Sequence, residues 1–592
     1  MTGTISKPLK IGLLVDGDSV PLWAAEIIKR LTAGNYAEIT LIVQNMLPGE
    51  PAQLRDIKTA PSGSALSFAL KLRRNASKLG YIGFGFLDHG LNILEPKKRK
   101  SETAYDAEKS LSELLPDTRV IEVVPKKLKF SDCLTSEDVE KIEEAEVDIL
   151  FRLGFRILRG GILNAARYGI WSYHHGDNRM MRGGPSGFWE LVTAAPTVGV
   201  ILQILNEDLD GGTVLTRSWH LPDIVKLNRQ RQNVFMQALS HFPRQVKRLH
   251  DMGEEAYFAE IKRQNQHPDY YSKRMFVAPN NRHAVWYIGQ HYLRYLAAKI
   301  RQLFFFRQWV LLASFRPTTQ IAKSMWRYKP LLPPRNRGWA DPFVIERDDK
   351  YYVFMEEIVY AKGRGHISVM TVEVGPNGQF ERTDPIPVIE QPYHMSYPFL
   401  FEYQDELYMI PETAENRTVD LYRCSEFPNT WEKVSTLIDN VVAVDATLLE
   451  HNGRWWMFAT VRENEHTNCL DELHIFHADS PLSTNWQPHV KNPVSTDVRN
   501  ARPAGTIQIH NGKLYRPAQN GSVRYGYGMN INLIEVLNEE DYQETIVSSI
   551  KPDWDRTINA THTLNHAGNL SVSDASKARF RYFRDKPKAP SS

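Results

Sequence analysis

Two adjacent histidines beside an aspartate lie in the segment WSYHHGDNRMMRGGPSGFWEL, residues 171–191. An imidazole titrates near neutral pH, so it can accept and release a proton during a reaction. The segment continues with Arg182, two glycines and a proline, and it closes on the apolar pair Phe188 and Trp189. Two interpretations are open: an active-site wall in which His174 handles protons, or a polar loop that leads into a helix.

A second group of reactive side chains recurs along the C-terminal half of the chain. They open five similar segments or end the strand that follows, and they comprise Asp341, Tyr397, Glu412, Asp445, Arg502 and His562. Paired carboxylates on either side of a glycosidic bond can act as acid and base. For the acidic members three roles are open: capping of turns and strands, sugar binding, and hydrolysis.

The first third of the chain alternates strand-like and helix-like patterns. Residues 9–17 and 37–45 are apolar runs of strand length, and residues 20–34 between them have helical periodicity. Further strands are predicted at 147–154 and 168–173. This alternation predicts a Rossmann-like parallel sheet covered by helices. Ligands of such sheets bind beyond the carboxyl ends of the strands, which is where the histidine segment begins.

Residues 147–217 resemble the core of the formyltetrahydrofolate-dependent formyltransferases. The resemblance rests on the order of four features: the turn GFRIL, a strand that ends beside His174, an Arg-Gly before an apolar helix, and LDGG at 209–212. It implies that His174 and Asp210 are the catalytic His and Asp. It also places Ser172 where the family has an asparagine that helps to polarise the formyl oxygen. Losing one such donor can cost a factor of about 10²–10³ in rate.

The same resemblance implies a cofactor, 10-formyltetrahydrofolate. Its pterin would be held largely by backbone groups around Phe155, Arg156, Ile157 and Leu158. We therefore predict a formyltransferase-like α/β domain over residues 1–222. Its topology leads us to expect His174 and Asp210 close together at the carboxyl edge of the sheet.

A helical connector is predicted over residues 223–305. Its first part, 223–263, is amphipathic with a basic face, and formyltransferases commonly follow their catalytic domain with helices. The most apolar stretch, 296–315, is interrupted by Lys299, Arg301 and Arg307, so no membrane-spanning helix is expected. Peripheral contact with an anionic membrane surface stays open for these helices.

From residue 306 the sequence is all-β and repetitive. Five segments each predict a strand, a tight turn and a second strand, and their turn residues are separated by 56, 48, 59 and 56 positions: Asp349, Asp405, Gly453, Gly512 and Gly568. Such a period is typical of propeller blades. We therefore predict a five-bladed β-propeller over residues 306–592, with residues 307–315 completing the ring from the N-terminal side.

The repeats also resemble two groups of known propellers. The motifs GWADPF, SYPFLF and YMIPET look like the N-terminal propeller of plant glucosamine inositolphosphorylceramide transferases, in which a separate domain performs glycosyl transfer. The acidic positions from separate blades resemble those of five-bladed furanosidases. Both resemblances imply that the six reactive side chains line a carbohydrate-binding funnel.

Composition limits the partners. The 592 residues include 72 Lys and Arg and 69 Asp and Glu, a formal net charge of +3, so nucleic acid is not an expected partner. The three cysteines lie far apart and form neither a metal-ligand spacing nor a disulfide framework, which predicts a reducing, cytoplasmic compartment and no metal site. The sequence carries no signal for an oligomeric state.

Two functions remain. In the first, the N-terminal domain transfers a formyl group from 10-formyltetrahydrofolate to an amine of an amino sugar or glycoconjugate precursor, and the propeller binds the carbohydrate. In the alternative, the formyltransferase scaffold is degenerate and carries a propeller that binds carbohydrate or performs glycosyl transfer or hydrolysis. His174 and Asp210 favour the first function, and Ser172 favours the second.

Overall fold

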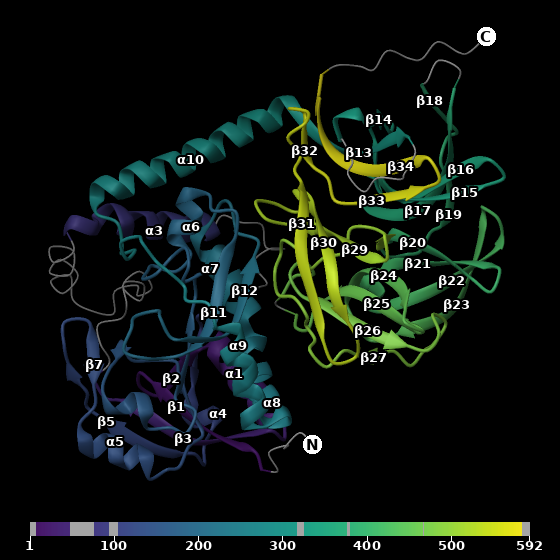
Figure 1. Ribbon diagram of the computed structural model, residues 1–592. Coiled ribbons are helices and arrows are strands. Elements are labelled where there is room, and N and C mark those ends of the chain that lie inside the picture. The colour runs from purple at the N-terminus through teal and green to yellow at the C-terminus, as the bar shows by residue number, and fades with distance from the viewer. Residues whose placement is uncertain are drawn as a thin grey trace. The chain divides into compact units, whose positions relative to one another are not determined.

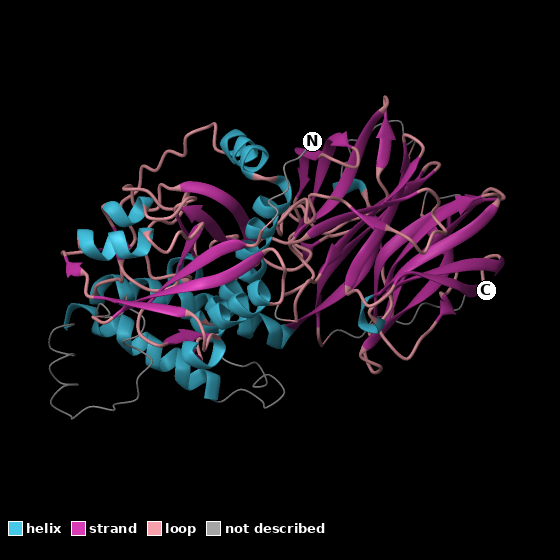
Figure 2. Cartoon of the chain, turned by 90° about the horizontal axis from the view of Figure 1, so that it is seen from below, coloured by secondary structure: helices cyan, strands magenta, loops and turns pink. Residues whose placement is uncertain are grey.

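The computed structural model describes residues 7–47, 76–93, 105–316, 325–375, 379–465 and 467–582. The chain divides into two compact units, Met1–Tyr295 and Leu296–Ser592 (Figure 1). The first unit is α/β, and the second consists almost entirely of strands (Figure 2).

The first unit is built on a seven-stranded mixed sheet. Its strands lie in the order β12 (Thr213–His220), β11 (Val198–Ile204), β10 (Ile170–His174), β8 (Ile149–Arg152), β1 (Leu9–Val15), β3 (Ala37–Asn45) and β5 (Arg119–Val123). From β5 to β10 all neighbours are parallel, as the alternating pattern predicts. Strand β11 is antiparallel to both of its neighbours, β10 and β12. A loop connects β11 to β12 as a hairpin at the edge of the sheet.

Helices cover both faces of this sheet because side chains alternate along each strand. Leu13 of β1 joins one core cluster and Leu14 joins the other. The first face is covered by α1 (Leu22–Thr32), α7 (Leu227–Gln237), α8 (His241–Met252) and α9 (Glu254–Gln264). The second is covered by α5 (Ser136–Glu143) and a 3-10 turn, Gly161–Asn164.

The helices predicted as a connector are therefore part of the first unit. Val234, Phe242 and Tyr257 are fully buried in the same cluster as the sheet. The predicted boundaries at 222 and 305 differ from the observed division after Tyr295 for this reason.

Two longer helices remain, α3 (Leu79–Ile93) and α10 (Asn281–Phe304). Aromatic residues of α3 and of the short helix α6 (Phe188–Thr193) form a separate cluster with the start of α10. Short pieces complete the unit: β2 (Ser19–Pro21), β4 (Glu108–Ser110), α4 (Leu111–Leu114), β6 (Lys126–Lys127), β7 (Ser131–Cys133) and β9 (Ile157–Leu158).

The second unit contains five antiparallel sheets. The first is β15 (Arg337–Arg347), β16 (Lys350–Val359), β17 (Arg364–Val374) and β18 (Phe380–Arg382), with β19 (Ile386–Ile389) also on β17. The second is β20 (Ser396–Tyr403), β21 (Glu406–Thr413), β22 (Thr418–Glu426) and β23 (Thr430–Ile438). The third is β24 (Ala443–His451), β25 (Arg454–Val461), β26 (Leu473–Ala478) and β27 (Gln487–Pro488).

The fourth sheet is β28 (Gln508–His510), β29 (Lys513–Asn520), β30 (Gly528–Leu537) and β31 (Tyr542–Ile550). The fifth is β14 (Lys329–Leu331), β13 (Phe305–Phe315), β34 (Leu570–Phe580) and β32 (Ile558–Ala560), with β33 (Leu564–Ala567) on β34. It joins segments from both ends of the unit, because β13 pairs with β34 along its whole length. Residues 307–315 therefore pair with the last repeat, as a closed ring would require, and the ring itself stays a prediction.

The five predicted hairpins are also confirmed. All five turn residues adopt the left-handed conformation that tight hairpins require, with φ of 57° at Asp349, 61° at Asp405, 74° at Gly453, 72° at Gly512 and 47° at Gly568.

Candidate functional site

His174 and Asp210 lie together in the first unit. His174 ends β10, and Asp210 lies in the loop between β11 and β12, with 3.4 Å between the imidazole Nδ1 and the carboxylate Oδ1. Their proximity was expected from the sequence, but parallel topology is not its cause. Strand β11 is antiparallel to β10 and ends opposite Trp171, so the loop that carries Asp210 has to reach back to His174 at the other end of β10.

Both members of this pair have further bonds within the chain. Nε2 of His174 lies 2.9 Å from the carbonyl oxygen of Met181. The other carboxylate oxygen of Asp210 accepts a hydrogen bond from the backbone N–H of Gly183 at 3.0 Å, and Asn178 donates to the Asp210 carbonyl at 3.0 Å. The pair therefore fastens the loop 178–183 to the sheet edge.

Ser172 forms a side-chain hydrogen bond with an arginine, Arg152. Its side chain is buried, and its hydroxyl accepts a hydrogen bond from Nη1 of Arg152 at 3.1 Å. Burial lowers the pKa of Arg152, which Asp16, Asp210 and Asp132 partly offset. The serine that replaces the family asparagine thus forms one structural unit with a buried arginine.

The segment predicted to hold the pterin is bonded internally. The backbone N–H groups of Phe155 and Arg156 donate to Asp16 and Asp132, each at 2.9 Å. Their carbonyl oxygens both accept from Nη2 of Arg152 at 3.0 Å. Ile157 and Leu158 form β9, which pairs with β7. These residues do not fit the folate cradle that the resemblance implies, because the groups that would bind the pterin already have partners.

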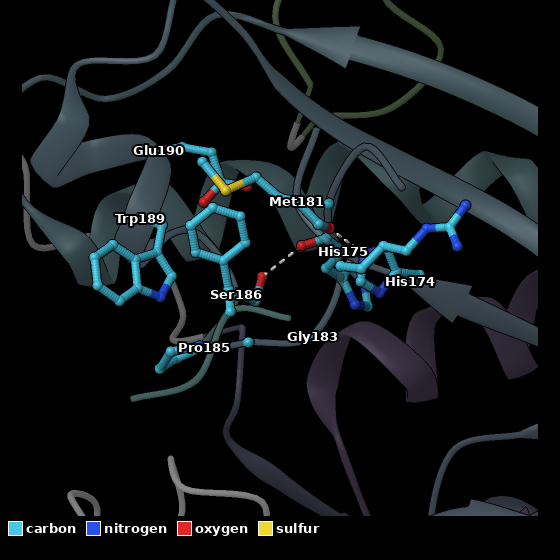
Figure 3. Close-up of a pocket in the computed structure, with 12 residues that line it drawn as sticks. His174, His175, Met181, Gly183, Pro185, Ser186, Trp189 and Glu190 are labelled. Carbon is cyan, nitrogen blue, oxygen red and sulfur yellow. Dashed lines mark hydrogen bonds between the residues drawn. The ribbon is translucent and has the colours of Figure 1, made fainter. Parts of the chain in front are cut away.

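A small pocket lies beside His174, between β10, the loop that follows it and α6 (Figure 3). Ser186 donates a hydrogen bond to the carbonyl oxygen of His175 at 2.9 Å. The His175 ring stacks on Phe235 at 3.6 Å, and burial lowers its pKa to about 3, so it stays neutral. Burial raises the pKa of Glu190 to about 7, which makes it the acidic group in this pocket that can exchange a proton near neutral pH.

Three strands of the second unit share one deformation. Asp341, Tyr397 and Asp445 have φ of 49°, 45° and 56°, a strained conformation for residues other than glycine that costs about 1–3 kcal/mol each. Each lies at a β-bulge on the first strand of its sheet: Ala340–Phe343 in β15, Ser396–Phe399 in β20 and Val444–Thr447 in β24. A bulge changes the direction in which a side chain points. In three sheets, the residue at the bulge of the first strand therefore departs from the regular alternation of side chains along that strand.

Arg502 connects two of the predicted acids. Its Nε lies 2.5 Å from Oδ2 of Asp445, and its Nη2 lies 3.3 Å from Oε2 of Glu412. Gln519 also donates to Asp445, at 2.8 Å. Burial alone would lower the pKa of Arg502, but Asp445, Tyr525 and Glu412 outweigh it and raise the pKa above its ordinary value. The guanidinium is therefore a fixed positive charge.

Tyr397 contacts two further segments of the second unit through its hydroxyl. Its hydroxyl lies 2.8 Å from Oγ1 of Thr447 and accepts a hydrogen bond from the backbone N–H of Gly505 at 2.8 Å. Tyr397 of the second sheet thus contacts Thr447 of the third sheet and Gly505 of the segment that precedes the fourth sheet.

His562 and Asp341 form a second group of contacts. We call the two groups together the central cluster, which comprises Arg502, Glu412, Asp445, Tyr397, His562, Asp341, Asp574 and Glu356. Nδ1 of His562 lies 2.7 Å from Oδ2 of Asp574 and 3.6 Å from Oδ1 of Asp341, and its ring stacks on Trp309 at 4.2 Å. Burial opposes the charge on His562, but Asp574 and Asp341 outweigh it and raise the pKa to about 9. His562 is therefore an imidazolium at neutral pH.

Asp574 joins the fifth sheet to the first. Its carboxylate accepts hydrogen bonds from the backbone N–H groups of Asp341 at 3.0 Å, His562 at 2.9 Å and Thr563 at 3.2 Å. Thr563 also donates to Asp341 through its hydroxyl, at 2.6 Å.

The acids of this cluster differ in proton affinity. Burial raises the pKa of Asp341 to about 6. Burial also raises the pKa of Glu356 and of Glu412 well above the ordinary value, with Arg502 partly offsetting the shift at Glu412. Burial thus raises the proton affinity of all three carboxyl groups, and acid–base chemistry on a sugar uses carboxyl groups whose pKa values are shifted in this way. In contrast, burial would raise the pKa of Glu357, but hydrogen bonds from His366, Arg337, Trp339 and Ser368 lower it to about 2, as in a structural carboxylate.

Three of these side chains could together contact a cation. The ligand atoms of Asp341, His562 and Asp574 lie within 4.8 Å of one another. The raised pKa of His562 opposes metal binding, because a protonated imidazole offers no lone pair. The expectation of no metal site stays a prediction.

Sequence reasoning singled out Glu412 but not Gln519 or Tyr525. Glu356, Glu412 and Gln519 each follow their turn residue by seven positions, a repeat signal that would have grouped them. Tyr525 lies outside the repeat, in the connection between β29 and β30, and it has no such signal. Its ring lies 5.3 Å from the guanidinium of Arg502, and the residue is 41% exposed.

Comparison with known proteins finds relatives of a part of the second unit. The family profile "Glucosamine inositolphosphorylceramide transferase 1, N-terminal" matches residues 335–578. Glucosamine inositolphosphorylceramide transferase 1 of Oryza sativa subsp. japonica is 34% identical over 212 residues, and that of Arabidopsis thaliana is 32% identical over 212 residues. These alignments cover 35% of this chain and 28% and 27% of the relatives, so the chain spans less than a third of their length.

The solved structures that match fall into two groups. Glycinamide ribonucleotide transformylase 1 from Symbiobacterium toebii has a TM-score of 0.25 at 12% identity and covers 41% of this chain and 87% of its own. Zg3597, a family 117 glycoside hydrolase from Zobellia galactanivorans, has a TM-score of 0.30 at 13% identity and covers 46% and 91%. We draw no functional conclusion from TM-scores this low. Residues 335–578 are thus similar to the N-terminal part of the glucosamine inositolphosphorylceramide transferases.

Proposed function

We propose that the protein is a carbohydrate-active transferase that acts on a glycoconjugate, and that the central cluster of its second unit binds the sugar. The observation that carries this proposal is the shared bulge at Asp341, Tyr397 and Asp445, which are strained positions in three successive sheets. Strain of this kind persists only where surrounding structure supports it, and it concentrates at functional sites.

The five sheets are, in this proposal, the blades of a propeller. The first strands of neighbouring sheets contact one another, as β15 does with β20 and β20 with β24. Strand β15 also contacts β34 of the fifth sheet. Pairing of β13 with β34 would then close the ring.

The charge of the cluster favours an amino sugar over a phosphate. It contains five carboxyl groups, Asp341, Glu356, Glu412, Asp445 and Asp574, against the two cations Arg502 and His562. Because both cations already contact carboxylates, an anionic ligand would have to compete with those carboxylates for them. Ammonium and hydroxyl groups would instead find acceptors. This balance matches the glucosamine in the relatives' name.

The acids can divide the chemistry of glycosyl transfer. Above its pKa of about 6, Asp341 can accept the proton of an acceptor hydroxyl as that oxygen bonds to the anomeric carbon. Glu412, whose proton affinity burial raises because its pKa lies above the ordinary value, is the candidate donor of a proton to the oxygen that leaves. The exposed ring of Tyr525 offers a surface on which a sugar can stack.

Formyl transfer from 10-formyltetrahydrofolate is favoured only by the short distance between His174 and Asp210. The internal bonding of Phe155 and Arg156 weighs against it. We therefore assign the first unit no formyl chemistry.

Calorimetric titration of the full chain with glucosamine, glucose and N-acetylglucosamine tests this proposal. We expect glucosamine to bind most tightly, and Asp445→Asn to weaken its binding about tenfold, because a charge-assisted hydrogen bond is lost. Glu450→Gln is the matched control, since Glu450 is an exposed carboxylate on the same strand. Absence of heat with all three sugars, or equal affinities of wild type and Asp445→Asn, would overturn the assignment.

A further inference from the structure

Helix α10 is apolar on two opposite sides. One side packs on the first unit: Ala284 and His291 are buried, and Tyr287, Ile288 and Tyr292 contact the cluster around Phe188 and Trp189. The other side carries five large apolar residues that are exposed, Trp286 at 62%, Leu293 at 66%, Leu296 at 54%, Ile300 at 48% and Leu303 at 63%. We call these five residues the outer stripe.

The outer stripe runs along most of a single helix, which is labelled α10 in Figure 1. Successive members are seven, three, four and three positions apart, the spacing of one face of an α-helix. Exposed apolar patches of this extent mark interaction sites.

The charge of α10 has one sign. The helix contains Arg282, Arg294, Lys299 and Arg301 and no aspartate or glutamate. Two copies of this chain that met along the stripe would each bring these four cations without an acid on the helix to offset them. An anionic surface instead complements them.

We propose that α10 lies flat on an anionic lipid surface, with the outer stripe inserted at the boundary between headgroups and acyl chains. A helix that combines an apolar stripe, a tryptophan and flanking cations has the features of an interfacial helix. None of the helices in the described residues is long and apolar enough to cross a membrane, and in-plane binding does not need one. The biological purpose rests on the proposed function, because a glycoconjugate with a lipid anchor would be presented at that surface.

Vesicle flotation of the full chain tests the proposal. The two vesicle types are phosphatidylcholine alone and an equal mixture of phosphatidylcholine and phosphatidylglycerol. We expect binding to the anionic vesicles, and we expect salt to weaken it, because the cations interact with the lipid charge. Arg282→Gln and Arg301→Gln, at two exposed cations of α10, should each reduce the affinity about fivefold.

The paired substitution Leu293→Glu with Ile300→Glu should reduce binding at least about tenfold, since it removes two inserted side chains. Its control is Ala298→Glu with Gln302→Glu, which makes the same change in charge at two exposed positions between the stripe residues. If both pairs lose binding equally, only net charge matters and the stripe is not inserted. Failure of the wild type to bind anionic vesicles also overturns the proposal.

Two further measurements distinguish lipid binding from dimer formation and from the proposed sugar binding. Sedimentation velocity without lipid should show a species that the stripe substitutions do not change. A dimer that Leu293→Glu dissociates would assign the stripe to a second copy and refute the lipid proposal. Asp445→Asn should leave vesicle binding unchanged, so a failed sugar titration refutes the proposed function without affecting this result.

Discussion

His174–Asp210 in the first unit and His562–Asp574 in the second are both pairs of an imidazole and a carboxylate, but their surroundings differ. In the first pair the other ring nitrogen contacts a backbone carbonyl, and the carboxylate fastens a loop. In the second, a further carboxylate, Asp341, lies 3.6 Å from the imidazole within a cluster of acids. Proximity alone therefore does not identify a reactive pair. The remaining bonding capacity of each group, and the charge around it, decide what it can do.

The largest effect should come from Asp574. Asp574→Ala removes the acceptor of three backbone N–H groups and leaves His562 without its closest counter-charge. Breaking a buried ion pair on one side costs about 3–5 kcal/mol. We expect urea to unfold the second unit at a much lower concentration, as followed by labelling of the free thiols Cys424 and Cys469. Asp439→Ala, at an exposed carboxylate, should leave the midpoint unchanged, and a shared loss would contradict the role of Asp574.

The second effect is a pH dependence of the second unit. The pKa of His562 is raised from 6.5 to about 9 in the folded state, so its contribution to stability is fully present below pH 6.5 and is lost as pH rises through 9. A shift of this size corresponds to roughly 3 kcal/mol. Urea midpoints measured by thiol labelling across this range should fall, and His562→Gln should flatten the decline. An unchanged slope in that variant would assign the decline to another group.

The first unit should respond in a lower pH range. Glu190 has a pKa raised from 4.5 to about 7, because burial penalises its charged form. The folded state therefore holds this proton more tightly, and stability declines as pH rises from 4.5 to 7. Glu190→Gln removes this decline, and we expect it to stabilise the unit at pH 8 by about 2 kcal/mol. Labelling of Cys133 reports on this unit alone, and a destabilised variant would show that the carboxylate is needed in its charged form.

The smallest effect should come from Asp210. Asp210→Ala removes the acceptor for the Gly183 N–H at the edge of the sheet and should cost about 1 kcal/mol. Hydrogen exchange of the loop 178–183 should accelerate, while exchange in β10 stays unchanged. If exchange in the loop were unaffected, the bond from Gly183 to Asp210 would not hold the loop in place. A catalytic role of His174 and Asp210 would then be favoured.

Local patterns predicted some of the elements of each unit, but not the helix α3. The turn residues Asp349 and Gly453 predict hairpins because they adopt positive φ. Each of them lies between two apolar runs, and these runs are strands in the structure. The strands of residues 9–17 and 37–45 were likewise predictable, because buried parallel strands are continuous apolar runs. The predicted sheet was wrong only at its edge, where β11 and β12 are antiparallel.

The sequence by itself determined the hairpins, their period and the acids that recur with it, because turn conformation and side-chain alternation depend on near neighbours. Tertiary structure decided which polar groups have partners. The contacts of Phe155 with Asp16 and of Asp341 with Asp574 join residues 139 and 233 positions apart. No local pattern encodes such contacts, because each depends on how the sheets pack. They are also the contacts that close the expected folate cradle in the first unit and assemble the acidic cluster in the second.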